Sequence, residues 1–335
     1  MKRSAYYSKP GNIRNLDLKE EELLEPNRGE VQVAVKAIGL NFADAFAVIG
    51  LYTAAGWKRF IPGLEFAGVV EKVGEGIGGF TVGQRVMGVT RFGAYTTALN
   101  ADARCVVPFP KDWSFEEGAA FPVAALTAYY GLIDQCDLEK GETVLIHSAA
   151  GGVGVMANRI AKKFGCFTIG LVGTADKIDF CKKEGYDRVI VRSRNFRREL
   201  QEALGNRILN VVMECTGGRF FRESLRALGK CGRMAVYGFA HYMPRGNGIP
   251  YLSTIWKYLT RPRVDVFHFN NISVSSFNLI FLVESTGEVK GYMEKIAALD
   301  FGKPYISQTY LFEELPLALQ ALKSGTTVGK IIVRA

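Results

Sequence analysis

The chain has 335 residues, of which 48% are hydrophobic and 22% charged, and its formal net charge is +9. This length exceeds the usual size of one hydrophobic core and predicts two domains, and the composition excludes a disordered or collagen-like protein. The apolar runs are far shorter than the roughly 20 residues that cross a bilayer, so we expect no transmembrane segment. The first residues carry no signal-peptide pattern, and we expect a cytoplasmic protein.

Charge and cysteine usage narrow the classes of partner. The 6 cysteines are scattered and form no Cys-x-x-Cys pair, which favours reduced thiols over disulfides or a metal centre. Lysine and arginine are distributed along the chain, apart from short groups at 192–198 and 261–263. We therefore expect no functional nucleic-acid binding, and a basic surface also suits a polyanionic dinucleotide.

The first part of the chain, up to about residue 120, predicts β-structure with frequent turns. Residues 31–35, Val-Gln-Val-Ala-Val, alternate in the manner of a strand, and residues 66–73 form an apolar, β-branched run. Glycines at 74, 76, 78 and 79 then mark a turn. This pattern favours a small closed barrel.

From about residue 141, short apolar strands alternate with helical patterns, which predicts βαβ units and a parallel sheet. The expected strands are 143–147, 167–172, 188–191, 209–214 and 233–237. After about residue 270 we expect a helix near 277–284, a second at 312–323 and a closing strand at 330–333. This last stretch is expected to return to the first domain, so the domains are predicted at 1–122 with 270–335, and at 123–269.

A glycine loop follows the first strand of the second domain. Its residues after His147 are Ser-Ala-Ala-Gly-Gly-Val-Gly, and the next helix has one apolar face. Glycine at 151 lets the backbone approach a pyrophosphate, glycine at 154 lets the helix pack closely on the strand, and the helix N-terminus attracts phosphate charge. A plain glycine turn of another α/β protein is the alternative. We expect the pyrophosphate to contact Ala150, Gly151, Gly152 and Val153.

The second strand of this domain ends in residues that select the cofactor. An Asp or Glu would hold the free ribose 2′-hydroxyl of NAD there, but Val172 stands in its place. Gly173 and Thr174 open the turn, and Lys177 and Arg192 offer positive charge for a 2′-phosphate. The pattern predicts NADPH over NADH. The alternative is that Lys177 and the arginines are solvated surface residues.

Several motifs together resemble one family. The matching segments are Gly39–Asp44, Ile61–Val70, Val82–Val86, Ala124–Gly131, the glycine loop and Val328–Lys330. In order and separation they resemble the zinc-independent quinone oxidoreductase branch of the medium-chain dehydrogenases/reductases, over essentially the whole chain. Within that branch the chain looks most like the vesicle-amine-transport protein homologues. The resemblance implies a GroES-like barrel as catalytic domain, a doubly wound Rossmann domain, and a cleft between them for the nicotinamide.

The zinc enzymes of that wider family have Cys at the position of Asn41 and His at the position of Leu64, with four further cysteines in a barrel loop. This chain has none of these ligands, and Glu65 alone cannot supply a zinc site. We expect no bound metal. Hydride transfer then depends on cofactor positioning and on hydrogen bonds to the substrate.

By analogy with the family, Asn41 contacts the nicotinamide ribose or the substrate oxygen, and Thr127 lies close to the carboxamide. Tyr52 is the candidate polar group of the substrate pocket, where its phenol hydrogen-bonds a carbonyl or passes a proton through water. Simple packing is the alternative for Tyr52. His147 is expected to be buried structure and not a base. Further expected cofactor contacts are Gly217, Gly238, Phe267, Phe269, Asn271 and Lys330.

These observations predict a zinc-free NADPH-dependent oxidoreductase that reduces quinones or α,β-unsaturated carbonyl compounds by hydride transfer. A homodimer is expected through Val264–Phe267, interpreted as a sixth strand at the edge of the Rossmann sheet. The alternative is an NADPH-binding protein with little turnover, acting as a structural, membrane-associated or RNA-associated factor.

Overall fold

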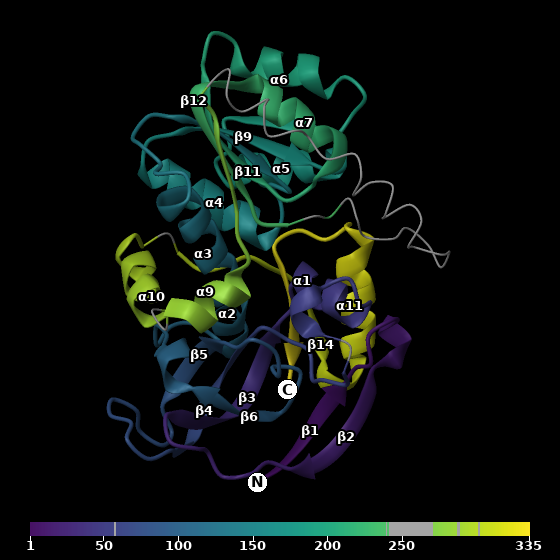
Figure 1. Cartoon of the computed structure of the whole chain (residues 1–335), viewed down its shortest axis with the longest axis vertical. Coiled ribbons are helices and arrows are strands. Elements are labelled where there is room, and N and C mark those ends of the chain that lie inside the picture. Colours follow the sequence, from purple (N-terminus) through teal and green to yellow (C-terminus); the bar gives the residue numbers. More distant parts are fainter. Residues whose placement is uncertain (57, 239, 241–270, 287–288, 301) are drawn as a thin grey trace. The chain divides into compact units, whose positions relative to one another are not determined.

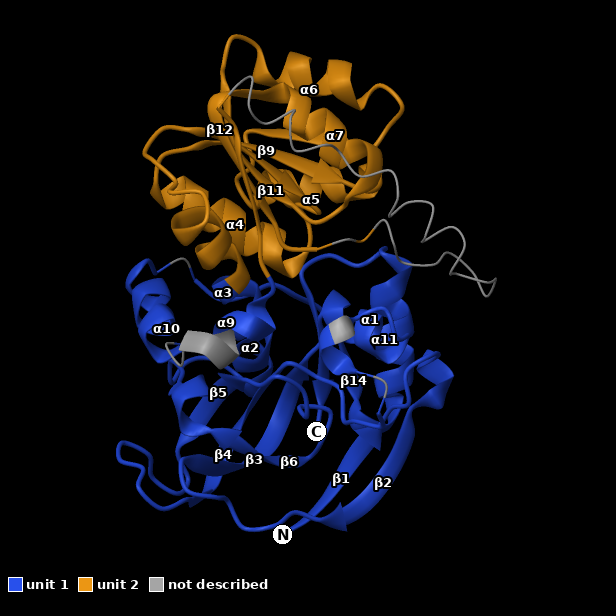
Figure 2. Ribbon diagram, in the orientation of Figure 1, with its two compact units in different colours: residues 1–126, 278–335 blue, residues 127–277 orange. Residues whose placement is uncertain are grey.

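The computed structural model describes the whole chain except residues 57, 239, 241–270, 287–288 and 301 (Figure 1). The chain forms two compact units (Figure 2). Unit 1 contains Met1–Leu126 and Asn278–Ala335, and unit 2 contains Thr127–Phe277. The boundaries expected after residues 122 and 269 lie four and eight residues before these divisions. Unit 1 is therefore assembled from two segments that are distant in the sequence.

The main sheet of unit 1 has seven strands among the described residues, in the order β14-β15-β3-β4-β5-β7, with β6 paired to β3. The strands are β3 (Glu30–Gly39), β4 (Glu65–Val73), β5 (Arg85–Val89), β6 (Ala98–Asp102), β7 (Val106–Pro108), β14 (Ile306–Leu311) and β15 (Lys330–Arg334). All pairs are antiparallel except β14 with β15. The long strand β3 is nearly continuously buried because it pairs with β4, β6 and β15.

Short helices complete unit 1. They are α1 (Phe42–Val48), α2 (Phe115–Ala120), α9 (Leu279–Thr286), α10 (Val289–Ala298) and α11 (Leu315–Ser324), with 3-10 turns at Ile13–Asn15, Thr53–Ala55, Ala103–Cys105 and Phe312–Glu314. Helix α3 (Pro122–Tyr129) crosses from unit 1 into unit 2. The helix expected from residue 277 begins at Leu279, after Asn278 whose side-chain oxygen accepts from the Ile280 N–H at 3.1 Å.

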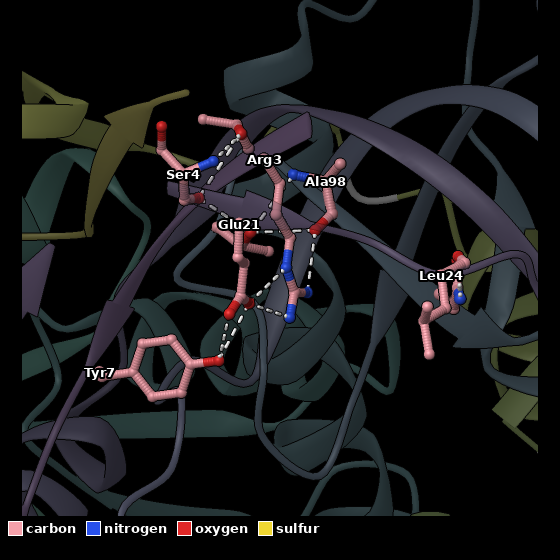
Figure 3. Close-up of polar contacts among 9 residues, drawn as sticks. Arg3, Ser4, Tyr7, Glu21, Leu24 and Ala98 are labelled. Atoms are coloured by element: carbon pink, nitrogen blue, oxygen red, sulfur yellow. Dashed lines mark hydrogen bonds and ion pairs between the residues drawn. The ribbon is translucent and has the colours of Figure 1, made fainter. Parts of the chain in front are cut away.

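A two-stranded hairpin, β1 (Lys2–Tyr7) with β2 (Asp17–Glu22), contacts the segment that leads into β6 through the backbone of β1, where the Tyr6 N–H donates to Tyr95 O and the Thr97 N–H donates to Ser4 O, both at 2.9 Å. An arginine cluster adds side-chain contacts (Figure 3). Arg3 donates to Glu21 Oε1 from Nε at 2.9 Å and from Nη2 at 2.6 Å, and the Tyr7 hydroxyl donates to both Glu21 oxygens at 2.9 Å. Arg3 Nη1 also donates to the carbonyl of Ala98 on β6 at 3.3 Å. This half-buried cluster and the backbone contacts together hold the hairpin next to β6.

Unit 2 contains a parallel sheet in the order β10-β9-β8-β11-β12-β13. The strands are β8 (Thr143–His147), β9 (Phe167–Val172), β10 (Arg188–Val191), β11 (Leu209–Glu214), β12 (Leu228–Val236) and β13 (Ser273–Ser276). This is the strand order of a dinucleotide-binding Rossmann sheet, and it confirms the predicted fold of this domain. Strand β12 begins at Leu228, earlier than expected, because Leu228 pairs with Leu209 of β11 ahead of a register shift. The expected strand Val264–Phe267 lies outside the described residues, so the homodimer stays a prediction.

Helices flank the sheet of unit 2 (Figure 1). They are α4 (Gly152–Lys163), α5 (Ile178–Lys183), α6 (Phe196–Leu204) and α7 (Gly218–Ala227), with a π-helical turn at Tyr130–Asp134 and a 3-10 turn at Ala175–Lys177. A buried cluster joins sheet residues such as Leu145 and Ile169 to Phe196 of α6 and Leu225 of α7. In the part of the chain that the structure describes, no helix combines the length and apolar character needed to cross a membrane.

Candidate active site and cofactor site

The glycine loop forms a tight turn between β8 and α4. Ser148 has φ +51°, and its carbonyl accepts from the Gly151 N–H at 2.8 Å. A Cβ on Gly154 would lie 2.6 Å from the carbonyl oxygens of Ser148 and Ala149, so only glycine fits there. The buried Tyr186 hydroxyl stabilises the turn by donating to Ala149 O at 3.2 Å and Gly154 O at 2.8 Å.

Helix α4 offers its N-terminus as an anion site. Its N-cap, Gly151, has no side chain to cap the first N–H groups. Ala150 is buried, whereas Gly151, Gly152 and Val153 are half-buried. The loop therefore has the close backbone approach and the N–H groups that a pyrophosphate requires.

The end of β9 brings two cationic side chains together. Val172 is buried, and a Cβ on Gly173 would lie 2.5 Å from Arg192 Nη2, so this guanidinium lies over the Gly173 backbone. Burial lowers the pKa of Lys177, the charge of Asp176 opposes that effect and the charge of Arg192 adds to it. Lys177 and Arg192 thus lie near enough to interact, at the position where the sequence predicts a 2′-phosphate. Thr174 precedes the turn Ala175–Lys177 and makes no side-chain cap bond.

A buried polar cluster shapes the turn after β11. Glu214 Oε1 accepts from the backbone N–H groups of Thr216 at 2.8 Å and Gly217 at 2.6 Å. His147 Nδ1 lies 3.2 Å from both Glu214 Oε1 and Thr216 Oγ1, and its Nε2 lies 3.0 Å from Ser224 Oγ. His147, Glu214 and Ser224 are each 0% exposed, so this Ser-His-Glu arrangement supports the Gly217 turn and is inaccessible to a substrate.

The structure does not bring every expected cofactor contact to the loop. Gly238 follows β12, where a Cβ would lie 3.1 Å from Cys215 Cβ. Asn271 precedes β13 and its Nδ2 donates to Cys231 Sγ at 3.4 Å. Because the strands are parallel, the amino end of β13 is at the opposite edge from the glycine loop, so Asn271 is not part of the proposed site. Phe267 and Phe269 lie outside the described residues.

In unit 1, Asn41 belongs to a buried ionic cluster. The Lys330 ammonium donates to Leu40 O at 2.8 Å, Asn41 Oδ1 at 2.8 Å and Glu65 Oε1 at 2.5 Å. Asn41 Nδ2 donates to the same Glu65 oxygen at 2.8 Å, and the Val123 N–H of α3 donates to Glu65 Oε2 at 2.8 Å. The Glu65 side chain is 0% exposed and that of Lys330 6%, whereas Asn41 is half-buried. The Glu65–Lys330 ion pair is buried, and Asn41 is the residue of the cluster whose surface stays partly exposed.

Asp44 lies beside this cluster and caps α1. Its Oδ2 accepts from the Asn41 N–H at 2.8 Å and from the Tyr95 hydroxyl at 3.0 Å. Its Oδ1 is buried and has no hydrogen-bond partner among the described residues. Burial raises the pKa of Asp44 to about 7, although the hydrogen bond from Asn41 and the charge of Lys330 act to lower it.

Tyr52 is held by an asparagine that the sequence did not indicate. The Tyr52 hydroxyl donates to Asn278 Oδ1 at 2.7 Å, and its ring meets that of Phe92 edge-on at 6.3 Å. Burial raises the pKa of Tyr52 to about 12, although the contact with Asn278 acts to lower it. The phenol therefore stays protonated and acts as a hydrogen-bond donor. Thr127 is buried in α3.

Some of the contacts that the sequence analysis missed had a recognisable sequence pattern, and others had none. Asp44 stands three residues after Asn41, which is the spacing of a capping box, and this signal could have been recognised. Lys330 was expected as a cofactor contact, but its pairing with Glu65 was not, because the two residues are 265 positions apart and no local pattern links them. Tyr186 and Asn278 likewise act through contacts distant in the sequence.

The large hollow of unit 1 is a separate feature. It has a volume of about 1160 Å³ and is lined by residues including Arg28, Phe80, Trp113 and Met293. None of the candidate site residues lines it. Its volume alone therefore gives it no role in the chemistry.

Family comparisons agree with both units. The alcohol dehydrogenase GroES-like domain family matches residues 27–111, and the zinc-binding dehydrogenase family matches residues 152–281. A GroES-like unit with a Rossmann sheet defines an oxidoreductase of the dehydrogenase/reductase class. The chain belongs to the medium-chain dehydrogenase/reductase superfamily and is similar to the VAT-1 homologues within it.

Three relatives illustrate this similarity. The synaptic vesicle membrane protein VAT-1 homolog-like of Mus musculus is 28% identical over 332 residues, which cover 96% of this chain and 79% of the relative. The quinone oxidoreductase of Escherichia coli, solved in complex with NADPH, is 28% identical with a TM-score of 0.86, covering 99% of this chain and 100% of that one. The CurK enoyl reductase is 27% identical with a TM-score of 0.84, covering 99% of each chain.

The zinc chemistry named for one matching family does not fit this site. Among the described residues, no three His, Cys, Asp or Glu side chains gather where they could share a metal ion. At the position of the expected ligands stand Asn41 and Leu64, and the Lys330 ammonium already neutralises Glu65. An amide, an alkyl group and a paired carboxylate do not make a zinc donor set.

Proposed function

We propose that this chain is an NADPH-dependent reductase of quinones or α,β-unsaturated carbonyl compounds. The observation that carries the proposal is the end of β9, where Lys177 and Arg192 lie close together and Val172 replaces the expected carboxylate. Two positive side chains suit the 2′-phosphate of NADPH, and a buried valine offers nothing to the free 2′-hydroxyl of NADH. The NADPH bound to the Escherichia coli quinone oxidoreductase supports the same cofactor here.

The residues present fit NADPH. Ala150, Gly151, Gly152 and Val153 would hold the pyrophosphate on the N-terminus of α4, where a bulkier residue 154 would collide with the loop. Thr174, Lys177 and Arg192 would hold the 2′-phosphate, and Gly217 and Gly238 follow the neighbouring strands. Asn41 and Thr127 are proposed for the nicotinamide half. When bound, the nicotinamide supplies the hydride.

Tyr52 is the residue that we propose for the substrate carbonyl. With a pKa near 12 it keeps its proton at neutral pH, so it donates a hydrogen bond and does not release the proton. In the structure that bond goes to Asn278, and a substrate oxygen would take the place of this acceptor. A fixed donor aimed at the carbonyl oxygen stabilises the negative charge that develops there.

NADPH consumption measured over a panel of quinones and 2-alkenals tests the proposal. We expect turnover with NADPH, and we expect Tyr52→Phe to lower kcat by roughly a hundredfold, the cost of one oxyanion donor. Tyr310→Phe is the matched control, because its surface hydroxyl bonds only to Gln308 among the described contacts. Binding of NADPH without consumption on any substrate would favour a binding protein with little turnover, in line with the vesicle membrane proteins among the relatives.

A further inference from the structure

We infer that Lys330 and Glu65 are positioning residues that act on the cofactor through Asn41, by fixing the orientation of its side-chain amide. This inference rests on the proposed function, in which Asn41 serves the nicotinamide half of NADPH. It replaces the direct cofactor contact that the sequence suggested for Lys330.

The ammonium of Lys330 has no proton left for a ligand. It carries three N–H donors, and the structure gives it three acceptors, Leu40 O, Asn41 Oδ1 and Glu65 Oε1, at 2.8, 2.8 and 2.5 Å. The Lys330 side chain is 6% exposed. A phosphate could reach this ammonium only by displacing interior partners.

The two charges allow one orientation of the Asn41 amide. Its Oδ1 faces the Lys330 ammonium, and its Nδ2 faces the Glu65 carboxylate at 2.8 Å. A flipped amide would place N–H groups against the ammonium and an oxygen against the carboxylate, both repulsive in a buried site.

This orientation determines what Asn41 offers to a ligand. One Nδ2 proton is used by Glu65, and the other points to Gly39 O at a longer 3.4 Å. Oδ1 has two lone pairs and uses one on Lys330. Asn41 therefore meets a ligand as a hydrogen-bond acceptor. This suits a ribose hydroxyl and does not suit a substrate carbonyl, which resolves the two roles that the sequence left open.

The backbone around the cluster is shaped for the Glu65 carboxylate. A Cβ on Gly39 would lie 2.5 Å from Glu65 Oε1 and 2.2 Å from Ala119 O, so glycine leaves the space that the carboxylate occupies. The second oxygen, Oε2, accepts from the Val123 N–H at the start of α3. Glu65 therefore connects Asn41, Lys330 and α3 from one fixed position.

A double-mutant cycle tests the inference by binding, without any need for turnover. NADPH and 2′,5′-ADP, which lacks the nicotinamide half, are titrated by calorimetry into wild type, Asn41→Ala, Lys330→Met and the double variant. We expect Lys330→Met to raise the Kd for NADPH about tenfold, the worth of one good hydrogen bond. In the Asn41→Ala background the same change should have little further effect, and 2′,5′-ADP should bind all four proteins equally.

Matched controls separate positioning from general damage. Lys303→Met removes an exposed lysine paired with Glu117 at 3.0 Å in the same unit, and we expect it to leave the Kd unchanged. Where Lys330→Met alone does not fold, Glu65→Gln with Lys330→Met removes both charges together and takes its place in the cycle.

Three outcomes overturn the inference: a tenfold loss that persists in the Asn41→Ala background, equal losses for NADPH and 2′,5′-ADP, or no loss at all. A wild type that binds NADPH without turnover contradicts the proposed reaction alone and leaves the cycle measurable. A wild type that binds no NADPH overturns both.

Discussion

Lys177 is buried and Arg192 half-buried, and this makes these two cations the residues through which the cofactor preference can be measured. The guanidinium lies over Gly173, and burial already lowers the pKa of Lys177. A dianionic phosphate placed between them would compensate the repulsion that the two cations share. These are the side chains that the sequence indicated for a 2′-phosphate, and the preference for NADPH stays a prediction.

We predict that Lys177→Ala weakens NADPH binding by roughly tenfold to a hundredfold, because it removes a charge-assisted hydrogen bond. NADH, which lacks the phosphate, should bind the variant and the wild type nearly equally. Calorimetric titration of both cofactors measures the effect. Lys182→Ala is the control, since that side chain is 66% exposed on the next helical turn. Equal losses for both cofactors would show that no phosphate is bound at Lys177.

Asp44 predicts a pH dependence of stability. Its pKa is about 7 in the folded protein and has an ordinary value of 3.8, so folding takes up a proton between these values. The stability that Asp44 contributes is complete below pH 3.8 and is lost as the pH rises through 7, by at most about 1.4 kcal/mol for each pH unit. Relative to wild type, Asp44→Asn, which stays neutral, should gain stability as the pH rises from about 4 to 7, and the difference should level off above pH 7.

Urea unfolding midpoints across that range check this prediction. Asp17→Asn is the control, because that carboxylate is 58% exposed. Parallel pH profiles for wild type and Asp44→Asn would rule out the titration of Asp44 in this window.

At the scale of elements, the glycine loop depends on a tyrosine from another part of unit 2. Tyr186 follows α5, and its buried hydroxyl donates to two carbonyls of the turn that begins α4. Its ring also fills the space beside Gly170 of β9, where a Cβ would lie 3.0 Å from Cδ1 of Tyr186. The conformation of the loop therefore depends on packing against strand β9 and the Tyr186 ring.

We expect Tyr186→Phe to lower the free energy of unfolding by roughly 1 to 3 kcal/mol, because two buried carbonyls lose a donor. NADPH binding should weaken as well, since the turn loses the contact that fixes Ala149 and Gly154. Thermal unfolding and a cofactor titration measure the two effects, with Tyr310→Phe as the surface control. A variant with unchanged stability and unchanged affinity would contradict the role.

Local sequence patterns predicted an element well where its own residues, without their pairing partners, defined it. Strands β8, β9, β10 and β11 begin and end at the expected residues, because each is a short apolar run between turns. The first half of β12 contains Gly229 and Gly232, which suggest a turn, and its pairing with β11 made it a strand. Asn271 was misplaced for a related reason, since only the sheet shows that β13 begins after it.

The candidate site divides in the same way. The glycine loop and the end of β9 are contiguous, so spacing alone located them. The Glu65–Lys330 pair joins β4 to β15, and it becomes visible only when β15 pairs with β3. Long-range pairing, and not residue type, was the missing information.

For the whole molecule, we predict that the purified protein holds no stoichiometric zinc. Asn41 and Leu64 supply no thiolate, imidazole or carboxylate ligand for zinc. The Lys330 ammonium is already paired with the Glu65 carboxylate and would repel a second cation there. Elemental analysis after exchange into metal-free buffer should give far less than one zinc per chain. A value near one zinc per chain would contradict this reading of the site.

The division of unit 1 into two segments has a consequence for how the protein is made. A ribosome adds roughly 5 to 20 residues each second, so the 265 residues between Glu65 and Lys330 take on the order of tens of seconds to synthesise. Throughout that time β3 lacks β15, and a buried Glu65 would have no counter-charge. Unit 2 is complete earlier, since all of its residues lie between the two segments. The nascent chain therefore carries the Rossmann unit ready to fold, while in unit 1 the edge of β3 stays open and Glu65 stays in water until β15 emerges.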